Sequence, residues 1–315
     1  MGKFLVTGGA GFIGSEICIS LIKANHQVLA FDDLSSGNLE NLREIINDPN
    51  FLFQEGDVRN YDEVLRAVSG QDYVIHEAAL VSVPRSIEEP VLNNEINVQG
   101  FLNVLEAARV SNVKRVVFAS SSAVYGDNPD AVKTEERLGN VISPYALSKR
   151  ADEMYASLYT RIYHLETVGL RYFNVYGEKQ DPSSVYSGVI SIFFDRVMKN
   201  APITIYGDGG ATRDFIYVSD VAAANLQACL SPNVHPGEAY NVGTGIPTTI
   251  QQLAAAVQKV SQNRLAISFQ PARPGDIRNS CAKTDKAKKH FGFQKKIDLE
   301  DGLKSIYANL SKQKA

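Results

Sequence analysis

A tyrosine and a lysine four residues apart could form a proton-transfer pair. Ser143 is a typical helix N-cap and Pro144 a typical first helical residue. Tyr145 and Lys149 are then expected one turn apart on the same helix face. A tyrosine phenol is a poor base near neutral pH because its ordinary pKa is about 10, and a neighbouring cation favours the phenolate. The same spacing is common on ordinary surface helices, so the rest of the chain must decide between the two interpretations.

Glycines near the N-terminus indicate a phosphate-binding turn. Gly8, Gly11 and Gly14 follow an apolar strand expected over residues 3–7, and they open an amphipathic helix expected to end at about residue 24. Glycine lets the backbone turn tightly and approach a pyrophosphate, while the helix N-terminus offers N–H groups and the positive end of its dipole. Because a strand and a helix flank the glycines, the motif predicts a dinucleotide site.

An acid follows the next expected strand, over residues 27–31. Asp32 can accept hydrogen bonds from the hydroxyls of an adenosine ribose and would repel a 2′-phosphate. No arginine follows it directly, so the sequence predicts NAD rather than NADP as the cofactor. A turn or capping role for Asp32 is the alternative, which the upstream glycines disfavour.

Strands and helices keep alternating through the first half of the chain. This alternation predicts an α/β fold with a doubly wound parallel-sheet Rossmann domain, whose ligands bind at the carboxyl ends of the strands. Ala78 and Ala79 are small and leave room for a cofactor, whereas the neighbouring His76 is expected to pack or to bond locally. Further strands are expected over residues 51–54, 72–76 and 113–119, and helices over 61–68 and 93–109.

The composition is that of a globular protein with no charge excess for nucleic acid. The chain has 315 residues, of which 44% are hydrophobic and 21% charged, and its net charge is -3. No apolar run approaches the roughly 20 residues of a membrane helix, and the first strand begins too early for a signal peptide. Cys18, Cys229 and Cys281 lack metal-ligand spacing, so no metal is expected and the predicted location is the cytoplasm.

Several motifs, in order along the chain, carry a resemblance to a known family. TGGAGFIG, the acid at Asp32, GDV, HEAA, SSSAVYG and YALSK together resemble the extended short-chain dehydrogenase/reductase family. LRYFNVYG, GDG, RDF and RPGD in the second half are similar to its nucleotide-sugar 4-epimerase branch. LVSVPRS over residues 80–86 and GEKQDP over residues 177–182 are most similar to the UDP-N-acetylglucosamine 4-epimerase subgroup.

The resemblance implies catalytic and cofactor-binding roles for particular residues. Tyr145 would be the acid/base, and Lys149 would hold the nicotinamide ribose and favour the phenolate. Ser121 would match the catalytic serine or threonine of the family, with Ser122 as the nearby alternate. Besides the glycines and the catalytic pair, NAD would be contacted by Phe12, Ile13, Asp32, Asp57, Val58, Ala78, Ala79, Asn97 and Tyr172.

A UDP-sugar needs cations for its diphosphate and polar groups for its uridine. The forked guanidinium groups of Arg213 and Arg273 suit phosphate oxygens, although either arginine alone would be read as a surface cation. Asn174 can donate to the same diphosphate, and Asp276 can accept from the uridine ribose. The other implied substrate contacts are Ser82, Ser121, Ser122, Tyr145, Val189, Thr204, Tyr206 and Ser280.

Ser280 occupies the position that, by resemblance, gates the sugar pocket. A bulky aromatic there would leave space only for glucose and galactose, whereas a small residue leaves room for an N-acetyl group at C2. Val81, beside Ser82, is a departure, because some relatives carry glycine there. A narrower pocket at Val81 leaves the preference between acetylated and plain sugars open.

The activity that follows is NAD-dependent C4 epimerisation through a transient 4-keto sugar. The expected substrates are UDP-N-acetylglucosamine and UDP-N-acetylgalactosamine, together with UDP-glucose and UDP-galactose. Three alternatives stay open: a UDP-glucose 4-epimerase with little N-acetyl activity, a UDP-glucuronate epimerase, and a non-catalytic nucleotide-sugar-binding module. A 4,6-dehydratase is disfavoured because Ser121, Ser122 and Ala123 provide no carboxylate to eliminate water.

The regular alternation ends near residue 177, which suggests two parts. Residues 1–176 are expected to form the NAD-binding domain, with later segments returning to it, and residues 177–315 a smaller α/β lobe for the UDP-sugar. The resemblance implies a homodimer in which the 93–109 helix and the Tyr145 helix of each subunit form a four-helix bundle. A stripe at helical spacing would face such a partner or simply the core: Ala151, Met154, Tyr155, Leu158, Tyr159 and Ile162.

Overall fold

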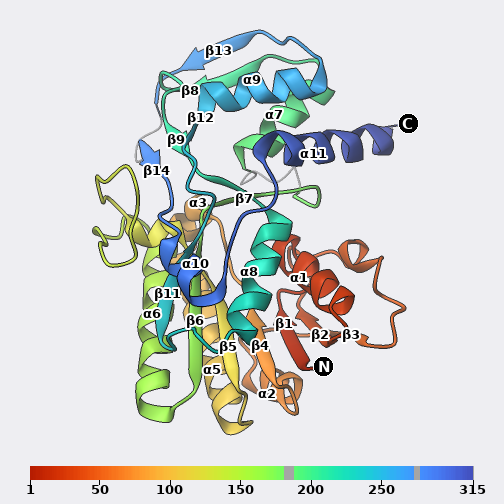
Figure 1. The fold of residues 1–315 in the computed structure, drawn as a ribbon, viewed down its shortest axis with the longest axis vertical. Helices are drawn as coiled ribbons and strands as arrows, with labels where there is room; N and C mark the ends of the chain where they lie inside the picture. Colours follow the sequence, from red (N-terminus) through yellow and green to blue (C-terminus); the bar gives the residue numbers. More distant parts are fainter. Residues whose placement is uncertain (181–187, 273–276, 315) are drawn as a thin grey trace.

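Seven parallel strands form one sheet in the order β11-β6-β5-β4-β1-β2-β3 (Figure 1). The structure, a computed structural model, describes residues 1–180, 188–272 and 277–314. The strand order turns back on either side of β1 and β4, which is the doubly wound arrangement expected from the alternation. The strands are β1 (Lys3–Thr7), β2 (Gln27–Asp32), β3 (Phe51–Glu55), β4 (Tyr73–His76), β5 (Arg115–Ser121), β6 (Glu166–Tyr172) and β11 (Glu238–Val242).

The central strands are apolar runs because both faces of the sheet are covered. Along β1, Phe4 and Val6 pack with one hydrophobic cluster and Leu5 with the other, and all three side chains are fully buried. The expected strand over residues 113–119 lies two residues further on. Ladder pairing with β6 continues through Ser120 and Ser121, so β5 outlasts its apolar run.

Helices cover the two faces of this sheet (Figure 1). One cluster joins residues of α1 and α8 to the sheet, and the other joins residues of α2, α5 and α6 to its opposite face. The helices are α1 (Phe12–Lys23), α2 (Tyr61–Val68), α5 (Gly100–Val110), α6 (Pro144–Tyr163) and α8 (Val218–Leu230).

The helix expected over residues 93–109 has a more complex form. It begins as α4 (Pro90–Asn94), passes through the π-helical turn η2 (Glu95–Gln99) and continues as α5. The short helix α3 (Val83–Glu88), which the sequence did not indicate, precedes it. A π-helical turn shifts the register of the side chains that follow it and is frequent at functional sites.

A smaller lobe with its own hydrophobic core lies beyond one end of the sheet, at the top of Figure 1. Its helices and its paired strands β8 and β13 alternate irregularly along the chain, whereas α8 and β11 return to the large sheet. Its elements are α7 (Val189–Met198), β8 (Ile203–Tyr206), α9 (Ile250–Ser261), β13 (Ile267–Gln270) and α11 (Leu299–Lys314).

Short strands connect the lobe to the sheet. Parallel β7 (Asn174–Tyr176) and β10 (Phe215–Tyr217) pair with each other, and β9 (Thr212–Arg213) pairs with both β12 (Thr248–Thr249) and β14 (Asn279–Ser280). The remaining short helices are η1 (Leu39–Leu42), η3 (Ser122–Tyr125) and α10 (Asp285–Phe291).

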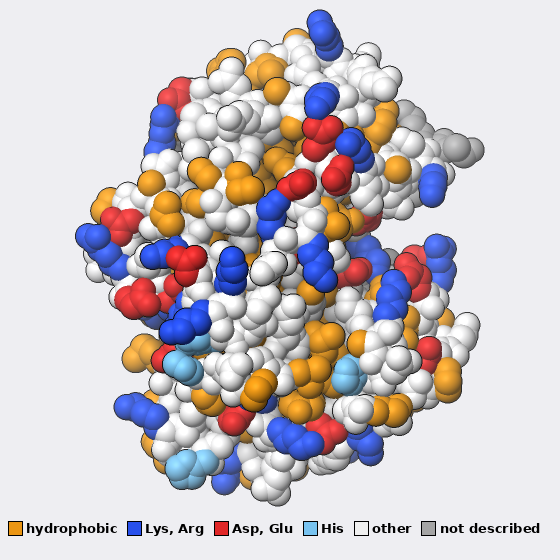
Figure 2. All heavy atoms as spheres, viewed as in Figure 1, with side chains coloured by type: hydrophobic (Ala, Val, Ile, Leu, Met, Phe, Trp, Pro, Cys, Tyr) orange, Lys and Arg blue, Asp and Glu red, His pale blue; other side chains and the backbone are white. Residues whose placement is uncertain are grey.

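The surface carries mixed charge. Figure 2 shows acidic and basic side chains interspersed over the face in view, with no large patch of one sign. Among the described residues, no helix combines the length and the apolar character needed to span a bilayer. Cys18, Cys229 and Cys281 are all buried free thiols, as their isolated positions in the sequence suggested.

Candidate active site

The glycine-rich turn after β1 leaves no room for side chains. Gly8 has a φ of +65°, and a Cβ on it would lie 2.7 Å from the Ala78 nitrogen. A Cβ on Gly14 would lie 2.1 Å from the Gly8 oxygen. Gly11 starts α1 without a side-chain cap, so the N–H groups of the first turn, beginning at Phe12 and Ile13, face a cradle that fits a pyrophosphate.

Asp32 closes this turn from the end of β2. Its carboxylate accepts from the Ala10 nitrogen at 3.0 Å and from the Leu34 nitrogen at 2.9 Å. Burial raises the pKa of Asp32, and these two N–H groups oppose the increase. Ionised carboxylates can accept further bonds through their remaining lone pairs, so Asp32 suits the ribose role expected for it.

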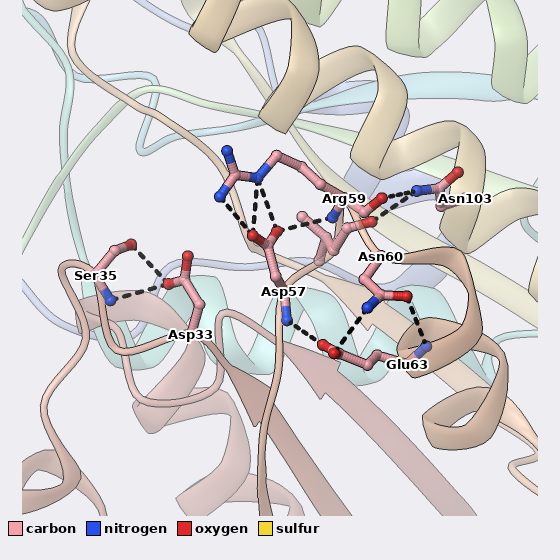
Figure 3. A network of polar contacts seen from close by, with 8 residues as sticks. Asp33, Ser35, Asp57, Arg59, Asn60, Glu63 and Asn103 are labelled. Carbon is pink, nitrogen blue, oxygen red and sulfur yellow. Dashed lines mark hydrogen bonds and ion pairs between the residues drawn. The ribbon is translucent and has the colours of Figure 1, made fainter.

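Asp57 and Arg59 form an ion pair in the loop after β3. Figure 3 shows the Asp57 carboxylate facing the Arg59 guanidinium, whose Nε lies 2.8 Å from Oδ2. Hydrogen bonding to Arg59 holds the pKa of Asp57 below its ordinary value. A cavity of about 570 Å³ lies beside the pair, with Asn60, Glu63 and Glu95 in its wall. Val58, also expected at the cofactor, is buried.

Two serine side chains, from Ser143 and Ser86, accept hydrogen bonds from backbone N–H groups in the first turn of α6. Ser143 caps the helix through its Oγ, which accepts from the Ala146 nitrogen at 3.1 Å. The Tyr145 nitrogen, which no intrahelical acceptor can reach, donates instead to Ser86 Oγ at 3.2 Å. Tyr145 is buried, with 8% of its surface exposed. The expected Ser143 cap is confirmed, and α3 adds a contact that the sequence did not indicate.

Lys149 lies in the interior among ionisable groups. Its Nζ is 3.5 Å from Asp152 Oδ2, and neither Asp152 oxygen has a hydrogen-bond partner among the described residues. Burial raises the pKa of Asp152 to about 7 although Lys149 lowers it. Burial also raises the pKa of Glu77 to about 7, with Tyr172 and Lys149 opposing the increase.

His76 is a neutral packing residue, as expected. Its Nδ1 is 2.7 Å from Thr7 Oγ1, and its ring stacks on Phe101. Burial, and secondarily the charge of Lys149, lowers the pKa of His76 to about 3. A histidine with this pKa is neutral near physiological pH.

Tyr172, an expected cofactor contact, is tied into the interior. Its phenol donates to Glu77 Oε1 at 2.6 Å and accepts from Asn225 Nδ2 at 2.7 Å. Burial, followed by the charge of Glu77, raises the pKa of Tyr172 well above its ordinary value. Glu77 and Asp152 were missed from the sequence, although the acid inside HEAA was a usable signal.

Asn97, another expected cofactor contact, sits in the π-helical turn and is fully buried. Its Oδ1 accepts from the Leu80 nitrogen at 2.7 Å, and its Nδ2 lies 3.1 Å from both the Leu80 oxygen and Ser148 Oγ. The side chain therefore fastens the chain after Ala79 to α6. These bonds position the residues around Tyr145. They occupy the Asn97 amide, for which the family resemblance implied a contact with NAD.

Ser121 and Ser122 lie at the junction of β5 and η3. Ser121 Oγ accepts from the Ala123 nitrogen at 3.1 Å as the cap of η3, which packs against α6. Ser120, by contrast, donates to Glu153 in the interior. The two half-buried hydroxyls therefore lie near the helix that carries Tyr145.

Among the described residues, the other expected substrate contacts lie in the strands that connect the two lobes, at the start of α3, or within the smaller lobe. Ser280 of β14 pairs in register with Arg213 of β9, and the Asn174 nitrogen bonds to the oxygen of the adjacent Asp214. Ser82 caps α3, which packs against α6. Val189, Thr204 and Tyr206 belong to the smaller lobe, and Arg273 and Asp276 lie outside the described residues.

A family model described as "NAD dependent epimerase/dehydratase family" matches residues 4–243. A curated relative named UDP-glucose 4-epimerase, from Mycolicibacterium smegmatis, is 36% identical over 303 residues, with 96% of each chain covered.

Solved structures agree over the full chain. A UDP-N-acetylglucosamine 4-epimerase from Methanobrevibacter ruminantium, in complex with UDP-N-acetylmuramic acid, has a TM-score of 0.94 at 36% identity and 99% coverage of each chain. A UDP-glucose 4-epimerase from Thermus thermophilus, in complex with NAD, has a TM-score of 0.88 at 38% identity, covering 98% of this chain and 99% of the other.

Proposed function

This chain belongs to the NAD dependent epimerase/dehydratase family, and we propose that it inverts C4 of UDP-N-acetylglucosamine and UDP-N-acetylgalactosamine. UDP-glucose and UDP-galactose are proposed as further substrates. The observation that carries the proposal is the placement of Tyr145 and Lys149, one turn apart on α6 and buried beside the carboxyl end of the sheet. NAD is the cofactor of the family, and the glycine cradle with Asp32 fits it.

The residues of the chain divide the proton chemistry among them. Tyr145, as the phenolate, takes the proton of the sugar 4-hydroxyl and later returns it to the 4-keto sugar. Lys149 favours the phenolate by its charge, and Ser121 supports the proton transfer through its hydroxyl. NAD held by the glycine-rich turn and Asp32 would supply the reversible hydride acceptor that oxidation and re-reduction of C4 need.

Inversion requires the sugar to turn while its nucleotide stays in place. Arg213 and Asn174 are proposed to hold the diphosphate, and both lie where short strands connect the two lobes. Arg273 and Asp276, outside the described residues, complete the proposed uridine diphosphate site. Residues 1–176 would form the NAD-binding domain and residues 177–315 the UDP-sugar lobe, with α8 and β11 returning to the sheet and with Tyr145 and Asn174 of the first domain reaching the substrate.

The acetylated sugars are supported by a small residue at the proposed gate. Ser280 is 8% exposed and stands in register with Arg213, so a larger side chain there would project toward the proposed diphosphate site. The Methanobrevibacter ruminantium relative, named for UDP-N-acetylglucosamine, supports the same choice.

A UDP-glucose 4-epimerase with little N-acetyl activity is the second candidate. The relatives from Mycolicibacterium smegmatis and Thermus thermophilus carry the name UDP-glucose 4-epimerase. Val81, the departure noted from the sequence, is 67% exposed in the loop before α3. An exposed Val81 can narrow the entrance to a sugar site without disturbing the packing of the core.

A homodimer through α6 is also proposed. Met154 and Ile162 of the apolar stripe are 66% and 59% exposed, and Leu158 and Tyr155 are each 37% exposed. These four side chains face outward, as a helix-bundle interface requires, whereas Tyr159 of the same stripe is half-buried against the core. The adjacent α4–α5 helix would supply the second helix of each subunit.

One incubation tests the proposed activity. The purified protein is mixed separately with UDP-N-acetylglucosamine and with UDP-glucose, without added NAD, and the C4 epimers are followed by NMR. We expect both sugars to be epimerised by cofactor that copurifies with the chain. Turnover of UDP-glucose alone would favour the second candidate, and a protein that holds NAD but epimerises no UDP-sugar would contradict the proposed function.

A further inference from the structure

The loop after β2 is fastened to the glycine-rich turn. The Ala10 oxygen accepts from the Asn38 nitrogen at 3.0 Å and from Asn41 Nδ2 at 2.9 Å. On its other side, the Ala10 nitrogen donates to Asp32 Oδ2 at 3.0 Å. The turn, Asp32 and the loop that contains η1 therefore form one hydrogen-bonded unit.

A lysine from beyond β7 crosses to this unit. Lys179 Nζ donates to the backbone oxygen of Asn41 at 2.8 Å and lies 4.0 Å from Glu16 Oε2 on α1. The Lys179 and Glu16 side chains are only 24% and 23% exposed. Burial lowers the pKa of Lys179 and raises that of Glu16, and the attraction between the two charges opposes both shifts. A lysine drawn this far out of water is stabilised by those specific partners.

The same segment lies over the start of α1. A Cβ on Gly177 would be 2.6 Å from Val218 Cγ1 and 3.2 Å from Phe12 Cε2, so glycine is what permits this approach. Phe12 is the first residue of α1, whose N–H groups face the proposed pyrophosphate position. Residues 177–179 therefore lie against the first two turns of α1, the helix whose N-terminus faces the expected phosphates of NAD.

We propose that Lys179 and Asn41 form a clasp that closes over the cofactor and slows the release of NAD. The inference rests on the proposed function, because it places NAD on the glycine-rich turn. A dinucleotide there lies beneath the segment that the clasp joins to the loop after β2, so its exit requires the Lys179–Asn41 contact to open. Such a clasp suits an epimerase, since its NAD is regenerated in every cycle and has no need to leave. Lys179 is thus a positioning residue that affects how long NAD stays bound.

The test measures cofactor exchange in the full chain. Protein purified with its NAD is mixed with excess isotopically labelled NAD, and the label bound to the protein is followed over time after gel filtration. The variants are Lys179→Met and Asn41→Ala, with Lys179→Arg as the conservative replacement. Lys199→Met is the matched control, since Lys199 follows the last residue of α7, pairs with Asp195 and is 66% exposed.

Exchange in Lys179→Met is expected to be about tenfold faster than in the wild type, because one hydrogen bond from a charged group is lost. Asn41→Ala keeps the backbone oxygen that Lys179 contacts but removes the Nδ2 bond to Ala10 that fastens the loop, so it should also accelerate exchange. Lys179→Arg and Lys199→Met should stay within about twofold of the wild type. Unfolding temperatures of the NAD-free proteins are measured alongside, and faster exchange with unchanged temperatures supports the clasp.

Three other results have distinct meanings. An unchanged rate in Lys179→Met, with wild-type protein that holds NAD, overturns the clasp and leaves the proposed function standing. Faster exchange that comes with a matching loss of NAD-free stability overturns the clasp as well, because general loosening then explains it. A wild-type protein that binds no NAD overturns the proposed function, and the clasp with it.

Discussion

Lys149 Nζ lies 3.5 Å from Asp152 Oδ2 one turn further along α6, and the two side chains are 2% and 1% exposed. The pair is surrounded by the interior, where Glu77 is the second carboxyl whose pKa Lys149 influences. Buried ion pairs gain little net stability, because desolvation offsets the attraction. The pair is therefore better explained by its fixing the position of the Lys149 ammonium group than by a contribution to folding.

The pH dependence of stability follows from these buried acids. Asp152 has a pKa of about 7 in the folded chain, whereas an unfolded aspartate has one of about 3.9. Between these values the folded chain holds a proton that the unfolded chain has released, so raising the pH favours unfolding. Below about pH 4 the acid is protonated in both states and the effect is absent. Glu77, with a pKa of about 7, acts in the same direction.

Asp152→Asn should therefore flatten this dependence. The free energy of unfolding, measured by urea titration from pH 4 to pH 8, is expected to fall by roughly 4 kcal/mol less in the variant than in the wild type, because the two pKa values differ by about three units at about 1.4 kcal/mol each. Asp195→Asn is the control, because Asp195 is a partly exposed acid of α7 paired with Lys199. Parallel curves for wild type and Asp152→Asn would show that Asp152 does not titrate in this range.

Removing the phenol of Tyr145 should stop catalysis and spare the cofactor. Tyr145→Phe loses the group that exchanges the proton, so the epimerisation rate is expected to fall by about 10³-fold, within the range of general acid–base catalysis. NAD bound per chain should stay at the wild-type level. Tyr155→Phe is the matched control, since Tyr155 lies on the same helix and is 37% exposed. Near-normal turnover by Tyr145→Phe would sink the assignment of the acid/base.

Strands of the sheet could be predicted where a short run of apolar residues specifies each one. Buried strands such as β1 and β4 are short apolar runs, and the helix between β1 and β2 has a clear start at Gly11. The start of α6 was equally visible, since Ser143 and Pro144 are sufficient local signals. The helix α3 was not predicted. Its Ser86 accepts a hydrogen bond from the Tyr145 nitrogen, a contact between residues far apart in the sequence.

The interior charges of the site could not be predicted for a related reason. Asp152 lies next to Glu153 in the sequence, yet Glu153 pairs with Arg171 while Asp152 faces Lys149. Helical spacing places both acids near the core and does not say which cation each one meets. Lys179 is a similar case, because the partner of that lysine lies 138 positions earlier in the chain.

Ser280 offers a test of sugar selection. Ser280→Tyr fills the proposed gate, so turnover of UDP-N-acetylglucosamine should fall by about tenfold or more, while that of UDP-glucose stays within about threefold. Ser280→Ala keeps the residue small and should retain both activities. The measurement is the ratio of kcat/KM values for the two sugars. If Ser280→Tyr turns over the acetylated sugar undiminished, the gate lies elsewhere.

The exposed stripe on α6 makes a final prediction about assembly. Leu158→Glu places a charge at the centre of the apolar face formed with Met154 and Ile162, and burying an unpaired charge at an interface is unfavourable. The wild type should sediment as a dimer and the variant as a monomer at micromolar concentration. Ile246→Glu is the control, because Ile246 is 50% exposed and belongs to the loop between β11 and β12 rather than to α6. Dimers that persist in Leu158→Glu, or a wild type that is monomeric, would refute the α6 interface.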